Sequence, residues 1–444
     1  MAKHTVKSHT ETDIAKPKNS EGKIGVLGAA AIGIGGMVGG GIFAVLGTAV
    51  GVARGGTPVA FIIAGIIALL TSYSYAKLSV KFPCAGGTVV YIDRAFGIDL
   101  WTGATNLMLW LSYLVTIGLY AAAFGSYGMT FFHGATAPWL KHALISAGII
   151  LPTVINLLNA DIIGKAETYI VIIKLTLLAV VVFFGAPHID TSKLAIAQWP
   201  GPLMLVAGGM VIFVAYEGFE LISNAGADVE DPTRTLPRAF YGSVIFVVIL
   251  YILVAMVTVG SVPADMIAKA KDYALSEAAK PSLGQIGFTM VAVAALLATF
   301  SAINATIYGN ARLGYTLAKD GELPAAMKRK VWNRPLDGVL LTAGLSLLLA
   351  NFVDLTSIAI MGSAGFLIIF AVVNASGLKL AKAIGANRII CGIGLVACII
   401  AIFALLVHSY EDNPHALWVV VSMVGVSLLF ELVFPKITGR KLKL

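Results

Sequence analysis

Three ionisable side chains stand inside long apolar stretches of this 444-residue sequence. Lys174 lies near the middle of the stretch 163–186, and Glu217 and Glu220 lie within the stretch 202–224. A charged side chain in hydrocarbon is expensive, so such residues usually face a cavity or a partner and mark the path of an ion or substrate. The chemistry that these groups offer is reversible proton binding.

Each of the three residues has a structural alternative. Lys174 would lie roughly 16 Å from the ends of its helix, at about 1.5 Å per residue, which is too deep for its ammonium to reach water easily. Desolvation disfavours the charged form of a buried amine, so Lys174 is predicted to exchange a proton near neutral pH. The alternative is a fixed ammonium that bridges helices through carbonyl groups. For Glu217 and Glu220 the alternative is a hydrated, structural position near the cytoplasmic mouth.

The sequence lacks the patterns of covalent or metal-dependent catalysis. Its three cysteines, Cys84, Cys391 and Cys398, have no metal-binding spacing, and its seven histidines form no HxxxH or HExxH motif. No Ser-His-Asp set or cofactor-binding loop is evident. We therefore expect a protein that is not an enzyme and that holds neither a metal nor a cofactor.

Composition indicates the environment of these residues. Hydrophobic residues make up 58% of the chain and charged residues 12%, with a mean hydropathy of +0.89, whereas soluble domains carry about 25% charged residues. The net charge of +8 is spread over short segments and forms no basic domain of the kind that binds nucleic acid. We expect a lipid bilayer around this chain, no nucleic acid and no obligatory protein partner.

Twelve stretches are apolar enough to cross a bilayer, which takes roughly 20 residues. No long loop separates them, so the sequence predicts one all-α polytopic bundle with 12 transmembrane helices. The stretches are 24–50, 58–81, 101–130, 141–158, 163–186, 202–224, 239–260, 285–312, 338–352, 356–378, 389–408 and 415–434.

The distribution of basic residues predicts the orientation, because Lys and Arg are enriched in cytoplasmic loops. With the amino terminus inside, 24 of the 31 basic residues fall in inside segments and 6 fall outside. Residues 1–23 and 435–444 are then cytoplasmic tails of a multi-pass protein of the cell membrane.

The first and sixth stretches are expected to be broken helices. Glycine fills six of the nine positions from Gly33 to Gly41, and each glycine inside a helix costs about 1 kcal/mol relative to alanine. Close packing through GxxxG pairs explains four of these glycines but not the run Gly39–Gly41. In the sixth stretch, the two glutamates flank the pair Gly218-Phe219.

Two broken helices in these positions suggest two five-helix repeats of opposite orientation, 24–186 and 202–378, followed by two further helices at 389–434. In such transporters the breaks meet near the middle of the membrane. Freed N–H groups and a half-helix amino terminus bind an anionic group there, while freed carbonyl groups bind a cation. A ligand with both charges, such as a free amino acid, suits this geometry.

Four segments carry a resemblance to a known family: GGMVGGGIF (35–43), YAKLSVKFPCAGGTVVYIDRAFG (75–97), FVAYEGFE with the downstream EDPTRTLPRA (213–239), and NATIYGNARLGYTLAKDGELP (304–324). The chain resembles the amino acid–polyamine–organocation (APC) transporters from about residue 22 to 440, and is most similar to the archaeal proton-coupled permeases of the ApcT type. The resemblance implies the leucine-transporter fold, with a 5+5 inverted repeat, broken helices 1 and 6, and two extra helices.

The resemblance also implies an amino acid site at the breaks. The backbone amides of Gly40 and Gly41 would bind the substrate carboxylate, with Gly39 allowing the turn. The carbonyl groups implied for the substrate amino group are those of Met37, Phe213 and Val214.

A gate and a coupling site are implied in the same way. The Phe213 ring would lie over the bound substrate. Lys174 falls where ApcT-type proteins carry a lysine in place of a sodium ion, and its ammonium would contact carbonyl groups near Gly35 and Val38, with Ser301 as a neighbour. The coupling ion would then be a proton, and no bound sodium is expected.

Two residues depart from the family pattern. Lys77 stands where many members have Glu, which leaves the cytoplasmic ion pairing open. Glu217 replaces an apolar residue beside the site and would bias the pocket toward cations, so side-chain selectivity does not carry over.

These observations predict a secondary active amino acid transporter that works by proton-coupled symport and alternating access. Two alternatives stay open: an amino acid or polyamine exchanger with the same fold, and a membrane-bound amino acid sensor. A sensor usually needs an output domain, and none is evident in the sequence.

Overall fold

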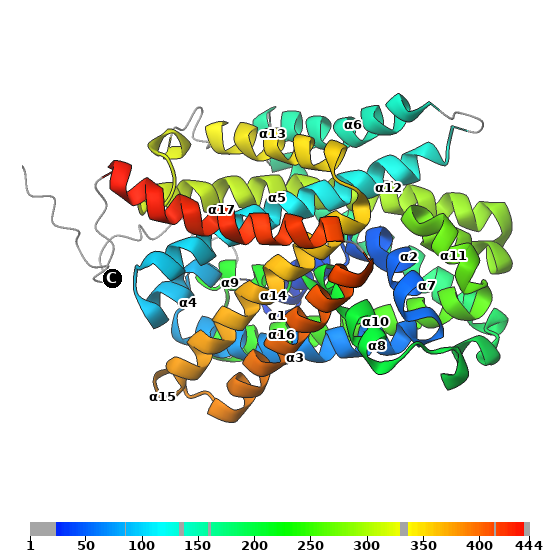
Figure 1. The fold of residues 1–444 in the computed structure, drawn as a ribbon, viewed down its shortest axis with the longest axis horizontal. Coiled ribbons are helices and arrows are strands. Elements are labelled where there is room, and N and C mark those ends of the chain that lie inside the picture. The colour runs from blue at the N-terminus through cyan, green and yellow to red at the C-terminus, as the bar shows by residue number, and fades with distance from the viewer. Residues whose placement is uncertain are drawn as a thin grey trace, which may run out of the picture.

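The computed structural model describes residues 24–84, 86–132, 137–158, 161–328, 336–412 and 414–438, which are nearly all helical (Figure 1). The predicted tails lie outside the described residues, except for 435–438, which end the last helix. Long helices such as α3 (Thr57–Lys81), α5 (Leu100–Met129) and α17 (Pro414–Thr438) run along the longest axis of the molecule.

The helices fall close to the predicted stretches. The first part of the chain forms α1 (Val26–Met37), α2 (Gly41–Ala53), α3, α4 (Gly87–Phe96), α5, α6 (Pro138–Leu158) and α7 (Asp161–Gly185). The second part forms α8 (Pro202–Val211), the 3-10 turn η5 (Phe213–Tyr216), α9 (Leu221–Asn224), α10 (Pro232–Ser261), α11 (Ala264–Ala270), α12 (Ala274–Lys319), α13 (Leu336–Phe352) and α14 (Leu355–Lys379). The chain ends with the short α15 (Ala381–Ile384), α16 (Arg388–Asp412) and α17.

Within the described residues, nine helices are long and apolar enough to cross a membrane, or ten when the bent pair α8 and η5–α9 counts as one span. Two further apolar helices, α1 and α13, are shorter. The molecule is therefore a polytopic helical membrane protein, and the count of 12 spans stays a prediction.

Helices at corresponding positions in the two predicted repeats pack against one another. α3 lies along α10, α5 along α12, and α6 against α13. The broken helices also meet, because α1 contacts α9 and α2 contacts α8. This pairing is the one expected of two interlocked five-helix repeats, whose bounds remain those predicted from the sequence.

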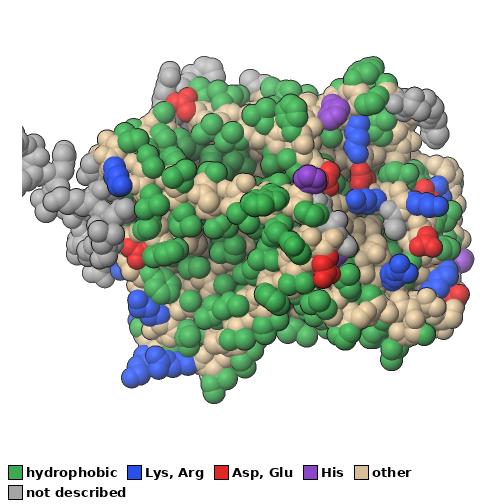
Figure 2. Space-filling view, viewed as in Figure 1, with side chains coloured by type: hydrophobic (Ala, Val, Ile, Leu, Met, Phe, Trp, Pro, Cys, Tyr) green, Lys and Arg blue, Asp and Glu red, His purple; other side chains and the backbone are tan. Residues whose placement is uncertain are grey.

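The surface has the distribution of side chains expected in a bilayer. On the face in Figure 2, hydrophobic side chains cover a broad band, and charged side chains lie mostly toward the ends of the long axis. Large apolar side chains such as Phe183, Ile249 and Trp418 are more than half exposed on the long helices. Because the transfer of apolar side chains from water to an apolar environment lowers the free energy, this band is suited to contact with lipid.

Three short helices were not predicted, and one helix is longer than expected. α4, α11 and α15 have only ten, seven and four residues and fall between the apolar stretches. α12 begins 11 residues before the predicted stretch 285–312 and is kinked at Gly284, where φ is 61°. Hydropathy does not detect such segments, because they are too short or too polar to read as membrane spans.

Candidate functional site

The first predicted break lies between α1 and α2. Helix α1 ends at Met37 and α2 begins at Gly41, with the residues between them buried. The backbone amides of Gly40 and Gly41 have no hydrogen-bond partner among the described residues. Unpaired amides at a helix amino terminus carry a partial positive charge and favour an anion. The break therefore has unpaired amides at the positions that the resemblance assigned to the substrate carboxylate.

The second break lies between α8 and α9, and the segment Phe213–Asn224 is bent by 51° relative to α8. Within that segment, Gly218 has a φ of 116°, which is unfavourable for any residue with a side chain. A Cβ atom on Gly218 would lie 2.5 Å from the carbonyl carbon of Gly36, and one on Gly36 would lie 2.9 Å from Cα of Gly218. Helix α1 and the turn that precedes α9 thus cross at these two glycines, backbone against backbone.

Lys174 reaches the first break from α7. Its Nζ atom donates a hydrogen bond to the carbonyl oxygen of Gly35 over 2.9 Å, and the residue is 2% exposed. The predicted contact with Gly35 is present. Val38 is buried at the end of α1. Ser301 is 9% exposed and precedes Ala302, whose Cβ lies 3.1 Å from where a Cβ on Gly39 would lie, so α12 also approaches the break.

Two polar side chains that sequence reasoning missed hold the second break in place. The N–H of Val214 donates to Oγ of Ser363 over 3.0 Å, and that hydroxyl donates to the carbonyl of Val211 over 3.0 Å. Ser363, on α14, thus satisfies one donor and one acceptor that the break would leave unpaired. The hydroxyl of Tyr251, on α10, lies 2.7 Å from the carbonyl oxygen of Met37 and 3.2 Å from that of Ala215.

The two glutamates of the second break are buried against α5. Glu217 is 5% exposed and accepts a hydrogen bond from the hydroxyl of Thr116 over 2.8 Å. Glu220 is 1% exposed and accepts hydrogen bonds from the hydroxyl of Tyr113 and from the amide of Gly218. Among the described residues, no ion pair links either carboxyl to a cation.

Helix α5 also covers the first break. Tyr120 lies one turn after Thr116, on the same face of α5. Its Cδ1 atom is 2.3 Å from where a Cβ on Gly40 would lie, so this glycine allows the ring to rest on the backbone. One face of α5 therefore connects the unpaired amides of the first break with the Glu217 carboxyl of the second.

The Phe213 ring, predicted as a gate, is fully buried and packs edge-on against Phe370 of α14, with ring centroids 5.8 Å apart. Phe370 also contacts Tyr75, Phe219 and Phe366. Phe213 therefore borders an aromatic cluster formed by α3, α14 and the turn before α9, and its role as a gate stays a prediction.

Comparison with known proteins decides the family. The family model described as "Amino acid permease" matches residues 24–429. The chain belongs to the amino acid permease family. This permease is 33% identical over 421 residues to an uncharacterized protein of Methanocaldococcus jannaschii, covering 94% of this chain and 96% of that protein. It is 31% identical to the inner membrane transport protein YbaT of Escherichia coli, covering 94% of this chain and 97% of YbaT.

A more distant relative is the serine/threonine exchanger SteT of Bacillus subtilis, 25% identical over 72% of each chain. The matching family and the transport proteins among the relatives make this permease a membrane transporter for amino acids and not an enzyme.

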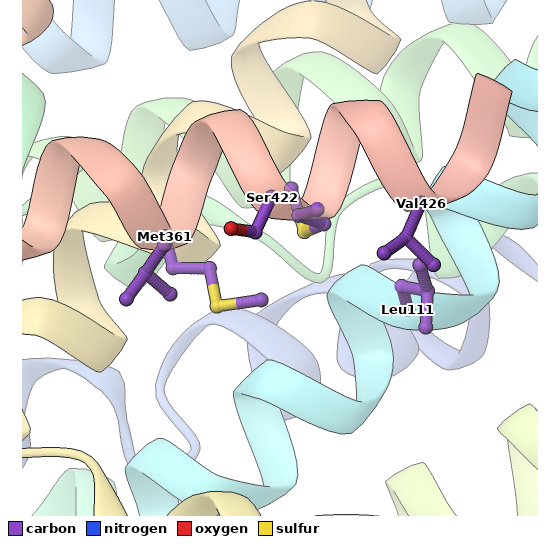
Figure 3. A pocket seen from close by; sticks show the side chains of 6 residues that line it. Leu111, Met361, Ser422 and Val426 are labelled. Carbon is purple, nitrogen blue, oxygen red and sulfur yellow. The ribbon is translucent and has the colours of Figure 1, made fainter. Parts of the chain in front are cut away.

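A surface crevice of this permease lies away from the residues above. It has a volume of about 270 Å³ and lies between α5, α14 and α17, where Leu111, Met361, Ser422 and Val426 line it (Figure 3). Its lining is apolar except for the Ser422 hydroxyl, so it offers no partner to either charge of an amino acid. The breaks remain the better candidate for the substrate site.

Proposed function

We propose that this permease is a proton-coupled amino acid symporter of the cell membrane that works by alternating access, with both termini cytoplasmic. The observation that carries the proposal is the hydrogen bond from Lys174 to Gly35. It connects a titratable side chain of α7 directly to the carbonyl end of α1, one turn before the break. No bound sodium is needed where an ammonium supplies this positive charge.

The proposed substrate site lies at the break of α1 and α2. The amides of Gly40 and Gly41 bind the substrate carboxylate, and carbonyl groups of the broken segments bind its amino group. Support comes from the unpaired state of these amides and from the contact between the two breaks at Gly36 and Gly218. Such a site recognises the α-amino and α-carboxyl groups, so it accepts several amino acids.

Proton coupling follows from the hydrogen bond of Lys174. The protonated ammonium donates to Gly35 and holds α7 against α1. When the proton is lost, a neutral amine makes a weaker hydrogen bond to the carbonyl, so the arrangement that separates α7 from α1 gains population. The proton gradient then sets the direction of the conformational cycle.

Uptake into sodium-free proteoliposomes tests the proposal. With a lower pH outside the vesicles than inside, and a panel of radiolabelled L-amino acids, we expect accumulation above the external concentration. Added sodium should give no further gain. Accumulation that needs sodium, or that is absent at every pH gradient, would exclude proton symport.

Exchange is the second candidate, because a relative over most of the chain is named as a serine/threonine exchanger. An exchanger takes up labelled substrate only when unlabelled substrate is present inside the vesicles. Uptake into empty vesicles under a pH gradient, compared with uptake into amino acid-loaded and polyamine-loaded vesicles without one, separates the two candidates.

A further inference from the structure

The hydroxyl of Tyr251 joins the two breaks. Tyr251 is fully buried on α10, and its hydroxyl lies within hydrogen-bond distance of the carbonyl oxygens of Met37, at the end of α1, and Ala215, in the turn after α8. These two residues come from different halves of the chain. The tyrosine therefore connects the two predicted repeats at the level of the candidate site.

The Tyr251 hydroxyl is shared between two acceptors. A tyrosine hydroxyl has one proton to donate, and both of its partners here are acceptors. The proton points mainly to Met37, at 2.7 Å, and the Ala215 carbonyl at 3.2 Å is the weaker partner. A small rotation of the O–H bond exchanges the two, because both oxygens lie within reach of the same hydroxyl.

The position of the hydroxyl is fixed by its ring. The ring packs against Phe61 of α3 and Tyr216 of η5, with centroid distances of 5.6 and 5.3 Å. Such close packing leaves the O–H rotation as the main freedom of this side chain. The hydroxyl oxygen is thus held in place while its proton can choose between two acceptors.

We propose that Tyr251 is a positioning residue for the substrate's ammonium group. This inference rests on the proposed function, in which the Met37 carbonyl binds that ammonium. Tyr251 holds the Met37 carbonyl in place in the empty site and turns its proton to Ala215 when the ammonium arrives. The carbonyl then becomes available to the substrate without any buried group losing its partner.

The test compares Tyr251→Phe with Tyr127→Phe. Tyr127 is also fully buried, and its hydroxyl donates to the carbonyl of Phe43 over 3.2 Å, a residue of the regular helix α2. Each variant keeps its ring and loses one hydroxyl. A general loss of stability would affect both variants, whereas a loss of ammonium positioning would affect Tyr251→Phe alone.

The measurement is competition against the tightest-binding radiolabelled L-amino acid, on purified protein. The competitors are that amino acid and its 2-hydroxy acid, which keeps the carboxylate and replaces the ammonium. For Tyr251→Phe we expect the inhibition constant of the amino acid to rise at least about tenfold, and that of the 2-hydroxy acid to change by less than about twofold. Tyr127→Phe should change neither by more than about twofold.

An equal change for both competitors, or no difference between the two variants, overturns the proposal. If Tyr251→Phe protein does not stay monodisperse, 3-fluorotyrosine at position 251 provides a second comparison, since it keeps the hydroxyl and makes it a stronger donor. The ratio of the two inhibition constants should then shift by more than about twofold relative to 3-fluorotyrosine at position 127, and an unchanged ratio overturns the proposal. Wild-type protein that binds no amino acid would instead refute the proposed function.

Discussion

The side chain of Lys174 donates a hydrogen bond of 2.9 Å to the backbone carbonyl oxygen of Gly35. It thereby links α7 to α1, the last and the first helix of the first predicted repeat. The acceptor lies two residues before the end of α1, and the lysine is 2% exposed. A proton on Lys174 therefore acts directly on the helix that leads into the proposed substrate site.

Replacing Lys174 should separate binding from coupling. We expect Lys174→Ala to bind amino acids but to lose accumulation driven by a pH gradient. Lys174→Arg should fail in the same way, because arginine stays charged at any accessible pH. Uptake into sodium-free proteoliposomes is the measurement. Lys269→Ala, an exposed lysine of α11, is the control and should behave as wild type. Normal proton-driven accumulation by Lys174→Ala would make Glu217 and Glu220 the next groups to examine.

Gly40→Ala should weaken substrate binding. The new Cβ would lie 2.3 Å from the Tyr120 ring, so the ring must move across the unpaired amides or the backbone must shift. We expect the dissociation constant to rise at least tenfold, equivalent to about 1.4 kcal/mol, in scintillation proximity binding to purified protein. Gly242→Ala meets open space on α10 and is the control. Gly41 is a poorer test site, because a Cβ there would lie 2.7 Å from the backbone of Ala215.

Gly218→Ala should destabilise the fold. The alanine would have to adopt a φ of 116° and place its Cβ against the backbone of Gly36. Left-handed strain of about 1–2 kcal/mol and overpacking of about 1–3 kcal/mol both oppose folding. Thermal unfolding in detergent should therefore occur at a clearly lower temperature. Gly344→Ala, which meets open space within α13, should leave the transition unchanged or raise it. Equal transitions for the two variants would contradict the close crossing.

Ser363→Ala should also lower stability. Removal of the Ser363 hydroxyl leaves the Val214 amide and the Val211 carbonyl without their partner inside the bundle. An unsatisfied buried polar group costs about 1–3 kcal/mol. Ser409→Ala is a matched control, since Ser409 is equally buried and bonds back to the carbonyl of Leu405 in its own helix. A loss of stability no larger than that of Ser409→Ala would show that Ser363 does not support the break.

The sequence was sufficient to predict the interruptions of both broken helices. Consecutive glycines and intramembrane carboxyls are local signals, and the structure places breaks at both. The supporting side chains could not be predicted, because their partners are far away in the chain. Tyr251 is 214 residues from Met37, and Ser363 is 149 residues from Val214. A tyrosine or serine in an apolar stretch has no local pattern that identifies such a partner.

The crossing of Gly36 and Gly218 has a mechanical consequence. Where two helices meet through interlocked side chains, sliding one past the other requires those side chains to change rotamer together. At this crossing the backbone of Gly36 approaches the backbone of Gly218 directly, because neither residue carries a side chain. We therefore expect little resistance to rotation at this point, so that one broken helix can change its angle relative to the other. The glycine pair would then keep the distance between the helices constant while their angle changes.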